Sequence, residues 1–215
     1  MDIRQSIYWH QGMFLQPQHF QHLEMHQQFA RQPLARLAQP YAWGLESLEL
    51  AESALANRVI EVRQLRLLWP DLTCIEYPGN AVIAARSFEK HWPDPDQPLN
   101  VYLAIRRLSA ASGNASVVDT LEQAGQVRSR YATLSSPASE QDVYAHSSEA
   151  PMPTLLHVVR LVFEEELGSL DDHDVIPLTQ LRQDAQQVRV LAVVDADAAR
   201  ATARSEERRV GKECL

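Results

Sequence analysis

The order of hydrophobic and polar residues divides the chain into a helical beginning and a longer part made of short strands. Between residues 20 and 38, apolar side chains recur at roughly helical spacing, which predicts a helix that Pro33 kinks or restarts. From residue 45 onward the spacing changes to the alternation that is typical of strands. The clearest case is residues 100–106, in which Val101, Leu103 and Ile105 share one face.

Turn-forming residues separate several further segments of this kind. The alternation of residues 59–69 slips midway, which indicates a β-bulge or a short turn. Residues 88–98 contain three prolines and residues 109–116 are small and polar, so we expect both to be loops. The other predicted strands begin at residue 45 or cover residues 73–77, 81–85, 127–134, 142–146, 155–163 and 188–194.

Short strands at fairly regular intervals, without a repeating strand–helix pattern, predict a mainly β fold. We expect an antiparallel β-sandwich preceded by an N-terminal arm and a helix. The arm and helix occupy residues 1–38, and the sandwich occupies residues 39–203. Residues 204–215 are almost wholly charged and have no apolar face. They are either foreign to this fold or a solvated, disordered tail.

Composition narrows the classes of function. The formal net charge is −8, and no cluster of lysines and arginines occurs in the part expected to fold, so we expect no nucleic acid partner. The first residues lack the pattern of a secretory signal, and no apolar run reaches the roughly 18 residues of a membrane span. Cys74 and Cys214 are the only cysteines. These features predict a cytoplasmic protein without a structural disulfide.

An unusual concentration of large apolar side chains lies close to the N-terminus, where most chains are polar and frayed. Glycine permits an uncommon backbone turn there, and proline fixes φ. Such a segment stays ordered only when its side chains dock, either on a partner or on the chain's own domain. The candidate residues for partner or oligomer docking are Trp9, Gly12, Met13, Phe14, Leu15, Pro17, His19 and Phe20.

Catalytic chemistry has weaker support in the sequence. Three histidines at positions 19, 22 and 26 share one helix face, but the neighbouring carboxylate, Glu24, faces the other way, so we expect no metal or other cofactor. Residues 171–174 and 164–166 are expected to be a solvated turn and a solvated strand or helix end. The motifs of nucleophile elbows, phosphate loops and zinc proteases are absent, so we expect no enzyme. A metal-dependent enzyme built on the N-terminal histidines is the alternative.

The segment of residues 9–21, WHQGMFLQPQHFQ, resembles the opening of the TssK family, also called VasE or ImpJ, of type VI secretion baseplate subunits. Residues 40–45, 69–73 and 175–177 are similar to three later segments of that family. Two positions depart from the family pattern. Leu72 stands where the family has a turn glycine, and Leu178 stands where it has a second proline.

This resemblance implies a trimeric structural protein with three parts. They are a β-sandwich shoulder similar to phage receptor-binding proteins, a helical neck, and a head that contacts the membrane complex of TssJ, TssL and TssM. The shoulder would face the baseplate wedge of TssF and TssG. We expect this chain to be the shoulder module, isolated or truncated, so that only the head would reach the membrane complex. A phage-type receptor-binding or adhesin domain is a further alternative.

Overall fold

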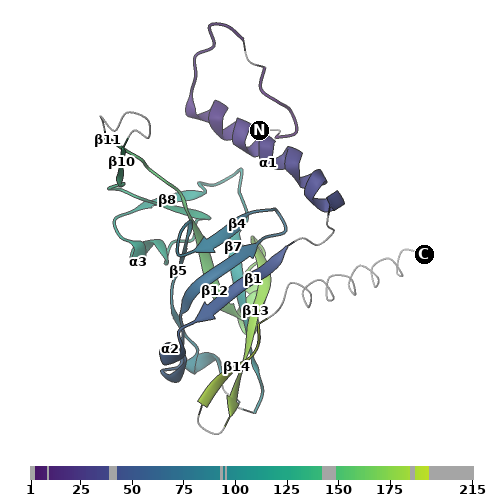
Figure 1. Cartoon of the computed structure of the whole chain (residues 1–215), viewed down its shortest axis with the longest axis vertical. Coiled ribbons are helices and arrows are strands. Elements are labelled where there is room, and N and C mark those ends of the chain that lie inside the picture. Colours follow the sequence, from purple (N-terminus) through teal and green to yellow (C-terminus); the bar gives the residue numbers. More distant parts are fainter. Residues whose placement is uncertain are drawn as a thin grey trace, which may run out of the picture.

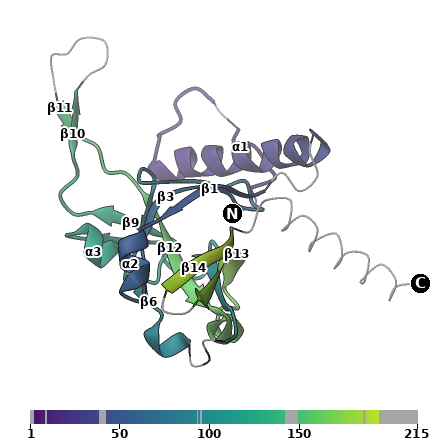
Figure 2. The ribbon, with the colours of Figure 1, turned by 60° about the horizontal axis from the view of Figure 1, so that its bottom comes forward.

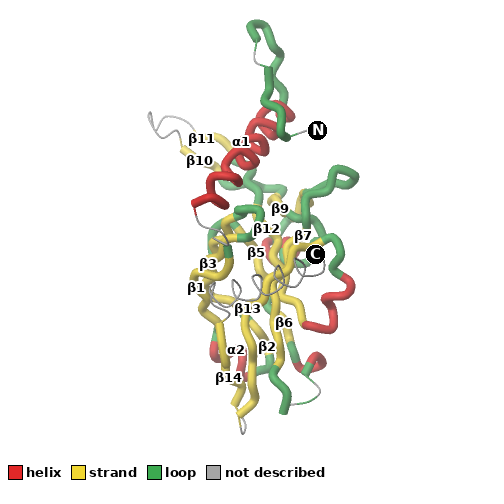
Figure 3. Tube along the Cα trace, turned by 90° about the vertical axis from the view of Figure 1, so that its right-hand side faces the viewer, coloured by secondary structure: helices red, strands yellow, loops and turns green. Residues whose placement is uncertain are grey.

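The structure is a computed structural model in which a helix and an extended arm lie at one end of a body of strands (Figures 1 and 3). The helix, α1 (Pro17–Ala38), begins before residue 20 and continues through Pro33 instead of ending there. The region predicted as arm plus helix therefore has both elements. The residues that the structure describes are 3–8, 10–38, 43–92, 94, 96–141, 149–184 and 187–193.

Two sheets form the body. The smaller sheet has the antiparallel order β1-β3-β4, from β1 (Gly44–Leu50), β3 (Val62–Leu68) and β4 (Cys74–Tyr77). The larger sheet has the order β14-β13-β7-β12-β9-β8, and β5 pairs with β12 beside this path. Its strands are β5 (Ala81–Ile83), β7 (Leu99–Arg106), β8 (Ala115–Val118), β9 (Tyr131–Leu134), β12 (Leu156–Phe163), β13 (His173–Asp184) and β14 (Gln187–Val193).

The hydrophobic core lies between the two sheets. Leu65 and Ile75 of the smaller sheet and Leu103, Leu161 and Leu178 of the larger sheet are all buried in one cluster. In β7, the inward residues alternate with residues of the outer face, because successive side chains of a strand point to opposite sides. The mainly β sandwich fold is therefore confirmed.

Short elements connect and extend the two sheets. One hairpin, β10 with β11, projects from the body (Figure 2). These elements are α2 (Glu52–Ala56), β2 (Val59–Ile60), β6 (Arg86–Ser87), η1 (Glu89–His91), α3 (Leu121–Ala124), β10 (Ser139–Gln141), β11 (Glu149–Pro151) and η2 (Glu164–Ser169).

Several details of the prediction are confirmed. The slip in residues 59–69 corresponds to an irregularity in β3, where Arg63 and Gln64 are both exposed and the register against β1 shifts between Glu49 and Leu50. The segment of residues 88–98 is mostly a loop, held by the buried rings of Phe88 and Trp92. The segment of residues 100–106 is a strand, β7.

Other details are wrong. The larger sheet is mixed, because β5 pairs with β12, and β8 with β9, in parallel. The longest strand, β13, was not predicted: Pro177 interrupts its alternation, and a register shift between Pro177 and Thr179 absorbs this interruption. Residues 115 and 116 were expected to be loop but are the first two residues of β8. The predicted strand 127–134 begins only at Tyr131, as β9. The predicted strand 142–146 and tail 204–215 lie outside the described residues.

Candidate docking arm and the polar sites of the sandwich

The N-terminal arm folds back on α1 through two histidines. Nε2 of His22 lies 2.7 Å from the carbonyl oxygen of Gln5, and Nδ1 of His26 lies 2.9 Å from that of Ile3. Because a backbone carbonyl only accepts, each of these ring nitrogens carries the donated proton. The arm is thereby closed into a loop that leaves α1, projects from it and returns to its first turn (Figure 1).

A tight turn reverses the chain within this loop. The N–H of Met13 donates to the carbonyl of His10 at 3.3 Å, and Gly12 has a φ of +83°. A positive φ at the third position of a β-turn is the geometry that favours glycine. A Cβ built on Gly12 meets nothing within 4 Å, so the requirement for glycine comes from the backbone conformation and not from crowding.

Pro17 and His19 organise the start of α1. Pro17 is the first helical residue, where a missing N–H costs nothing and a fixed φ is favourable. The N–H of Gln16 donates to Nδ1 of His19 at 3.0 Å, and the N–H of His19 donates to the carbonyl of Gln16 at the same distance. Two of the predicted docking residues therefore set the direction in which the loop leaves the helix.

The large apolar side chains of the arm point into solvent. The exposed fraction is 80% for Phe14, 51% for Leu15 and 54% for Phe20. Tyr8, which the sequence analysis did not single out, is 84% exposed. Its position beside Trp9 was the signal that could have identified it. Met13 is half-buried, and Trp9 lies outside the described residues.

The histidines of the arm and helix are engaged in these backbone contacts. His22 and His26 each use one ring nitrogen on a carbonyl of the arm, and His19 uses Nδ1 on Gln16. Within the described residues, no group of three or more histidine, cysteine or carboxylate side chains is placed to hold a metal ion. The same part of the chain contains no helix long and apolar enough to cross a membrane.

A partly buried polar cluster, which sequence reasoning missed, joins the turn before β4 to the residue before β9. Arg130 is 2% exposed, and one of its terminal nitrogens donates to Asp71 Oδ2 at 2.8 Å and to Thr73 Oγ1 at 2.9 Å. Its other terminal nitrogen donates to the carbonyl of Arg106 at 2.9 Å. Because Asp71 and Arg130 are 59 residues apart, no local pattern connects them.

The cluster shifts two titratable groups. Partial burial alone would raise the pKa of Asp71, but hydrogen bonds from Thr73 and the charge of Arg130 outweigh it and lower that pKa. Burial, and then the charge of Arg130, lower the pKa of His157 to about 4 against the opposing charge of Asp71. His157 is therefore neutral at pH 7. Leu72, in the same turn, has a φ of +68°, in the left-handed region that favours glycine.

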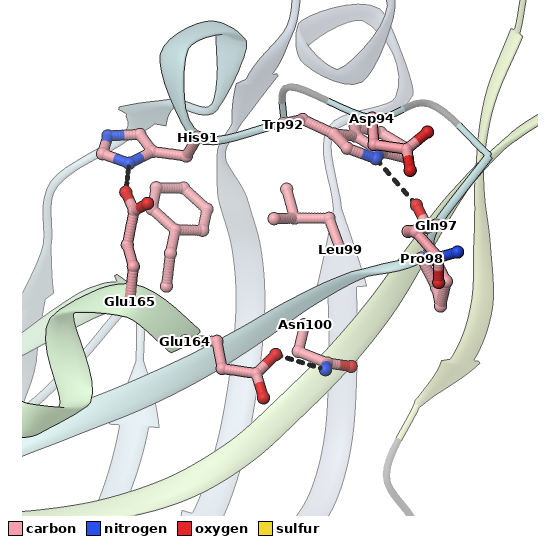
Figure 4. A pocket seen from close by; sticks show the side chains of 10 residues that line it. His91, Trp92, Asp94, Gln97, Pro98, Leu99, Asn100, Glu164 and Glu165 are labelled. Carbon is pink, nitrogen blue, oxygen red and sulfur yellow. Dashed lines mark hydrogen bonds and ion pairs between the residues drawn. The ribbon is translucent and has the colours of Figure 1, made fainter.

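A cleft of about 390 Å³ lies between η1 and the ends of β7 and β12, and Figure 4 shows the side chains that line it. Its polar groups are bonded to each other. His91 Nδ1 contacts Glu165, Asn100 donates to Glu164 at 2.8 Å, and the indole N–H of Trp92 donates to a carbonyl at 2.8 Å. Each of these polar groups therefore has a partner within the protein.

Two other expectations about acidic residues are only partly right. Glu164 and Glu165 are exposed at the start of η2, directly after β12, as expected. Only Asp171 and Asp172 of the predicted turn 171–174 lie in a turn, and the following residues begin β13 with His173 buried. Glu166 is not simply solvated: its carboxylate receives both terminal nitrogens of Arg86, at 2.6 and 2.7 Å. Partial burial would raise the pKa of Glu166, but the bonds from Arg86 and from the Phe163 N–H lower it.

Comparison with known proteins supplies the context for these features. Residues 19–193 match the model of a family described as bacterial type VI secretion, with EvfL, ImpJ and VasE. No curated protein matches the chain significantly.

Three solved structures have a similar fold, each over 88% of this chain. A cryo-electron microscopy structure of a TssK-TssF-TssG baseplate subcomplex has 21% identity and a TM-score of 0.73, with 60% of that chain covered. A crystal structure of TssK has 21% identity and a TM-score of 0.69, with 41% covered. A type VI secretion baseplate complex has 23% identity and a TM-score of 0.71, with 58% covered. The present chain thus spans 60% or less of each of these chains.

Proposed function

Because the chain belongs to the VasE (ImpJ, TssK) family of bacterial type VI secretion proteins, we propose that it is a non-catalytic shoulder module of the secretion baseplate. Its partner in this role is the wedge formed by TssF and TssG. A TssK with the same fold is part of a TssK-TssF-TssG subcomplex, which supports this assignment. In the assembled machine three copies form a trimer, and contact with TssJ, TssL and TssM falls to a head region beyond this module.

The described part of the projecting loop, residues 7–8 and 10–16, is together with Phe20 the docking element. The observation that carries this proposal is the exposure of Tyr8, Phe14, Leu15 and Phe20 on a loop that the chain itself holds in place. Solvent-exposed apolar side chains gathered on one segment mark an interaction site. Anchoring at both ends lowers the conformational entropy lost on binding.

The energy available from these rings is large enough to matter. Burying an exposed phenylalanine is worth about 2 kcal/mol, which corresponds to roughly thirtyfold in affinity for each ring. Phe14 is 80% exposed, so most of this burial energy is still available for binding in the free chain. Phe20 is 54% exposed, so about half of it is still available there.

A pull-down with the cognate TssF and TssG tests this proposal. The double change Phe14→Ala, Phe20→Ala should reduce retention of the wedge at least tenfold, because both rings lose their burial at the interface. The melting temperature should change little, because neither ring is buried in the free chain.

A matched control removes two apolar side chains elsewhere on the surface. Val117 and Leu121 are 70% and 52% exposed and lie at β8 and α3 of the sandwich. The double change Val117→Ser, Leu121→Ser should leave retention of the wedge unchanged. Equal retention by both double variants, each verified as folded by circular dichroism, would contradict the docking role of the loop.

A further inference from the structure

A second cleft lies on the outer face of the larger sheet. It has a volume of about 460 Å³, and its lining includes Arg106, Arg128 and Arg160. Arg160 of β12 pairs with Ala104 of β7, and this face of the sheet also carries Val162. Because side chains alternate along a strand, Arg106 and Arg160 project to the same side. Arg106 also donates to the carbonyl of Arg128 at 3.5 Å, which places the three arginines together.

The two carboxylates of this cleft already have partners. The carboxylate of Asp172 accepts a hydrogen bond from Nε of Arg106 at 2.9 Å. Its other oxygen lies 2.6 Å from Nδ1 of His173. Glu166 is held by Arg86, which approaches from outside the cleft lining. One arginine of the three is therefore neutralised within the cleft.

Arg128 and Arg160 remain uncompensated. Their guanidinium groups make no hydrogen bond, ion pair or ring contact with any residue that the structure describes. Arg128 lies in the segment before β9 and Arg160 lies in β12, so the cleft brings together two like charges, which repel each other in the free chain. The cleft of Figure 4 is different, because Glu164 accepts a hydrogen bond from Asn100 and Glu165 contacts His91.

We propose that this arginine cleft binds an acidic segment of a protein partner, with a glutamate or aspartate carboxylate received by Arg128 and Arg160. Guanidinium groups bind carboxylates through two parallel hydrogen bonds. Val162 and Leu170 in the cleft wall fit the aliphatic part of a glutamate side chain. The chain as a whole carries a net charge of −8, which disfavours a long polyanion such as nucleic acid but permits one short acidic segment.

Fluorescence anisotropy with a labelled hexaglutamate peptide tests the proposal on the full chain. The peptide should bind, and added salt should weaken the binding, because the contact is between exposed charges. The double change Arg128→Gln, Arg160→Gln should weaken binding about tenfold or more, since two charged hydrogen-bonding groups are lost.

The control variant, Arg63→Gln, Arg66→Gln, removes the same charge from β3. Those arginines are 57% and 52% exposed and lie near Glu49 and Glu46. It should change the affinity for the peptide less than about twofold, because these arginines lie in the smaller sheet and do not line the cleft. An equal loss in both double variants would reduce the effect to net charge and overturn the proposal.

Three other outcomes would also overturn it. The first is absence of binding by the hexaglutamate peptide. The second is tighter binding of a labelled DNA duplex than of the peptide, and the third is full competition by inorganic phosphate at an equal concentration of charge. A melting temperature of the Arg128→Gln, Arg160→Gln variant that is equal to or above that of the unaltered chain supports the proposal. A clear fall would make these arginines structural and contradict it.

Discussion

Removing the negative charge from the buried Asp71–Arg130 pair should destabilise the sandwich strongly. In Asp71→Asn, the amide can still accept the N–H of Thr73, but it no longer compensates the charge of Arg130, which is 2% exposed. Breaking one partner of a buried pair costs about 3–5 kcal/mol. The lower end applies here, because the Asp71 side chain is 37% exposed and Arg130 keeps its bonds to Thr73 and Arg106.

We therefore expect Asp71→Asn to lower the free energy of unfolding by about 3 kcal/mol and the melting temperature by roughly 6–12 °C. Urea and thermal unfolding followed by circular dichroism measure both quantities. The control is Glu46→Gln, which breaks a surface pair with Arg66, in which both side chains are more than half exposed. Its expected cost is below about 1 kcal/mol. If Asp71→Asn costs no more than Glu46→Gln, the reasoning about the buried pair is refuted.

Three further predictions concern other parts of the chain. His157 has a pKa of about 4 in the folded chain and binds its proton more readily in the unfolded chain, so the free energy of unfolding should fall as the pH drops from 6.5 towards 4. In urea unfolding, His157→Phe should make this free energy depend less on pH. An unchanged pH dependence would contradict the prediction. Glu166→Gln should cost about 1–3 kcal/mol in the same assay, because Arg86 loses its carboxylate; a cost near zero would refute this. Gly12→Ala should weaken retention of TssF and TssG more than Gly12→Asn, because asparagine tolerates positive φ better; equal retention would count against the turn.

The sequence predicted those elements whose signal is local. The alternation in β7 identified its buried face, and the slip in residues 59–69 identified the irregularity at Arg63 and Gln64 of β3. Strand β13 was missed because Pro177 interrupts its pattern, and only pairing with β7, with its shift between Pro177 and Thr179, makes that interruption compatible with a sheet. The parallel pairing of β8 with β9 likewise depends on contacts between separate segments.

The same distinction applies to the sites. Gly12 and Phe14 could be identified from the sequence, because a glycine turn and clustered apolar residues are local features. The attachment of the arm by His22 and His26 could not be identified, because the carbonyl acceptors belong to residues 17 and 23 positions away. The grouping of Arg128 with Arg160 could not be identified either, because residues 32 positions apart meet at one cleft only in the folded chain.

The central claim is that the projecting arm is buried by the baseplate wedge. Hydrogen-exchange mass spectrometry of peptides covering residues 10–20, with the chain alone and then bound to TssF and TssG, tests it most directly. We predict slower exchange in the loop of residues 10–16 and in the first turn of α1 when the wedge is bound. Exchange at the same fast rate in a verified complex would contradict the claim.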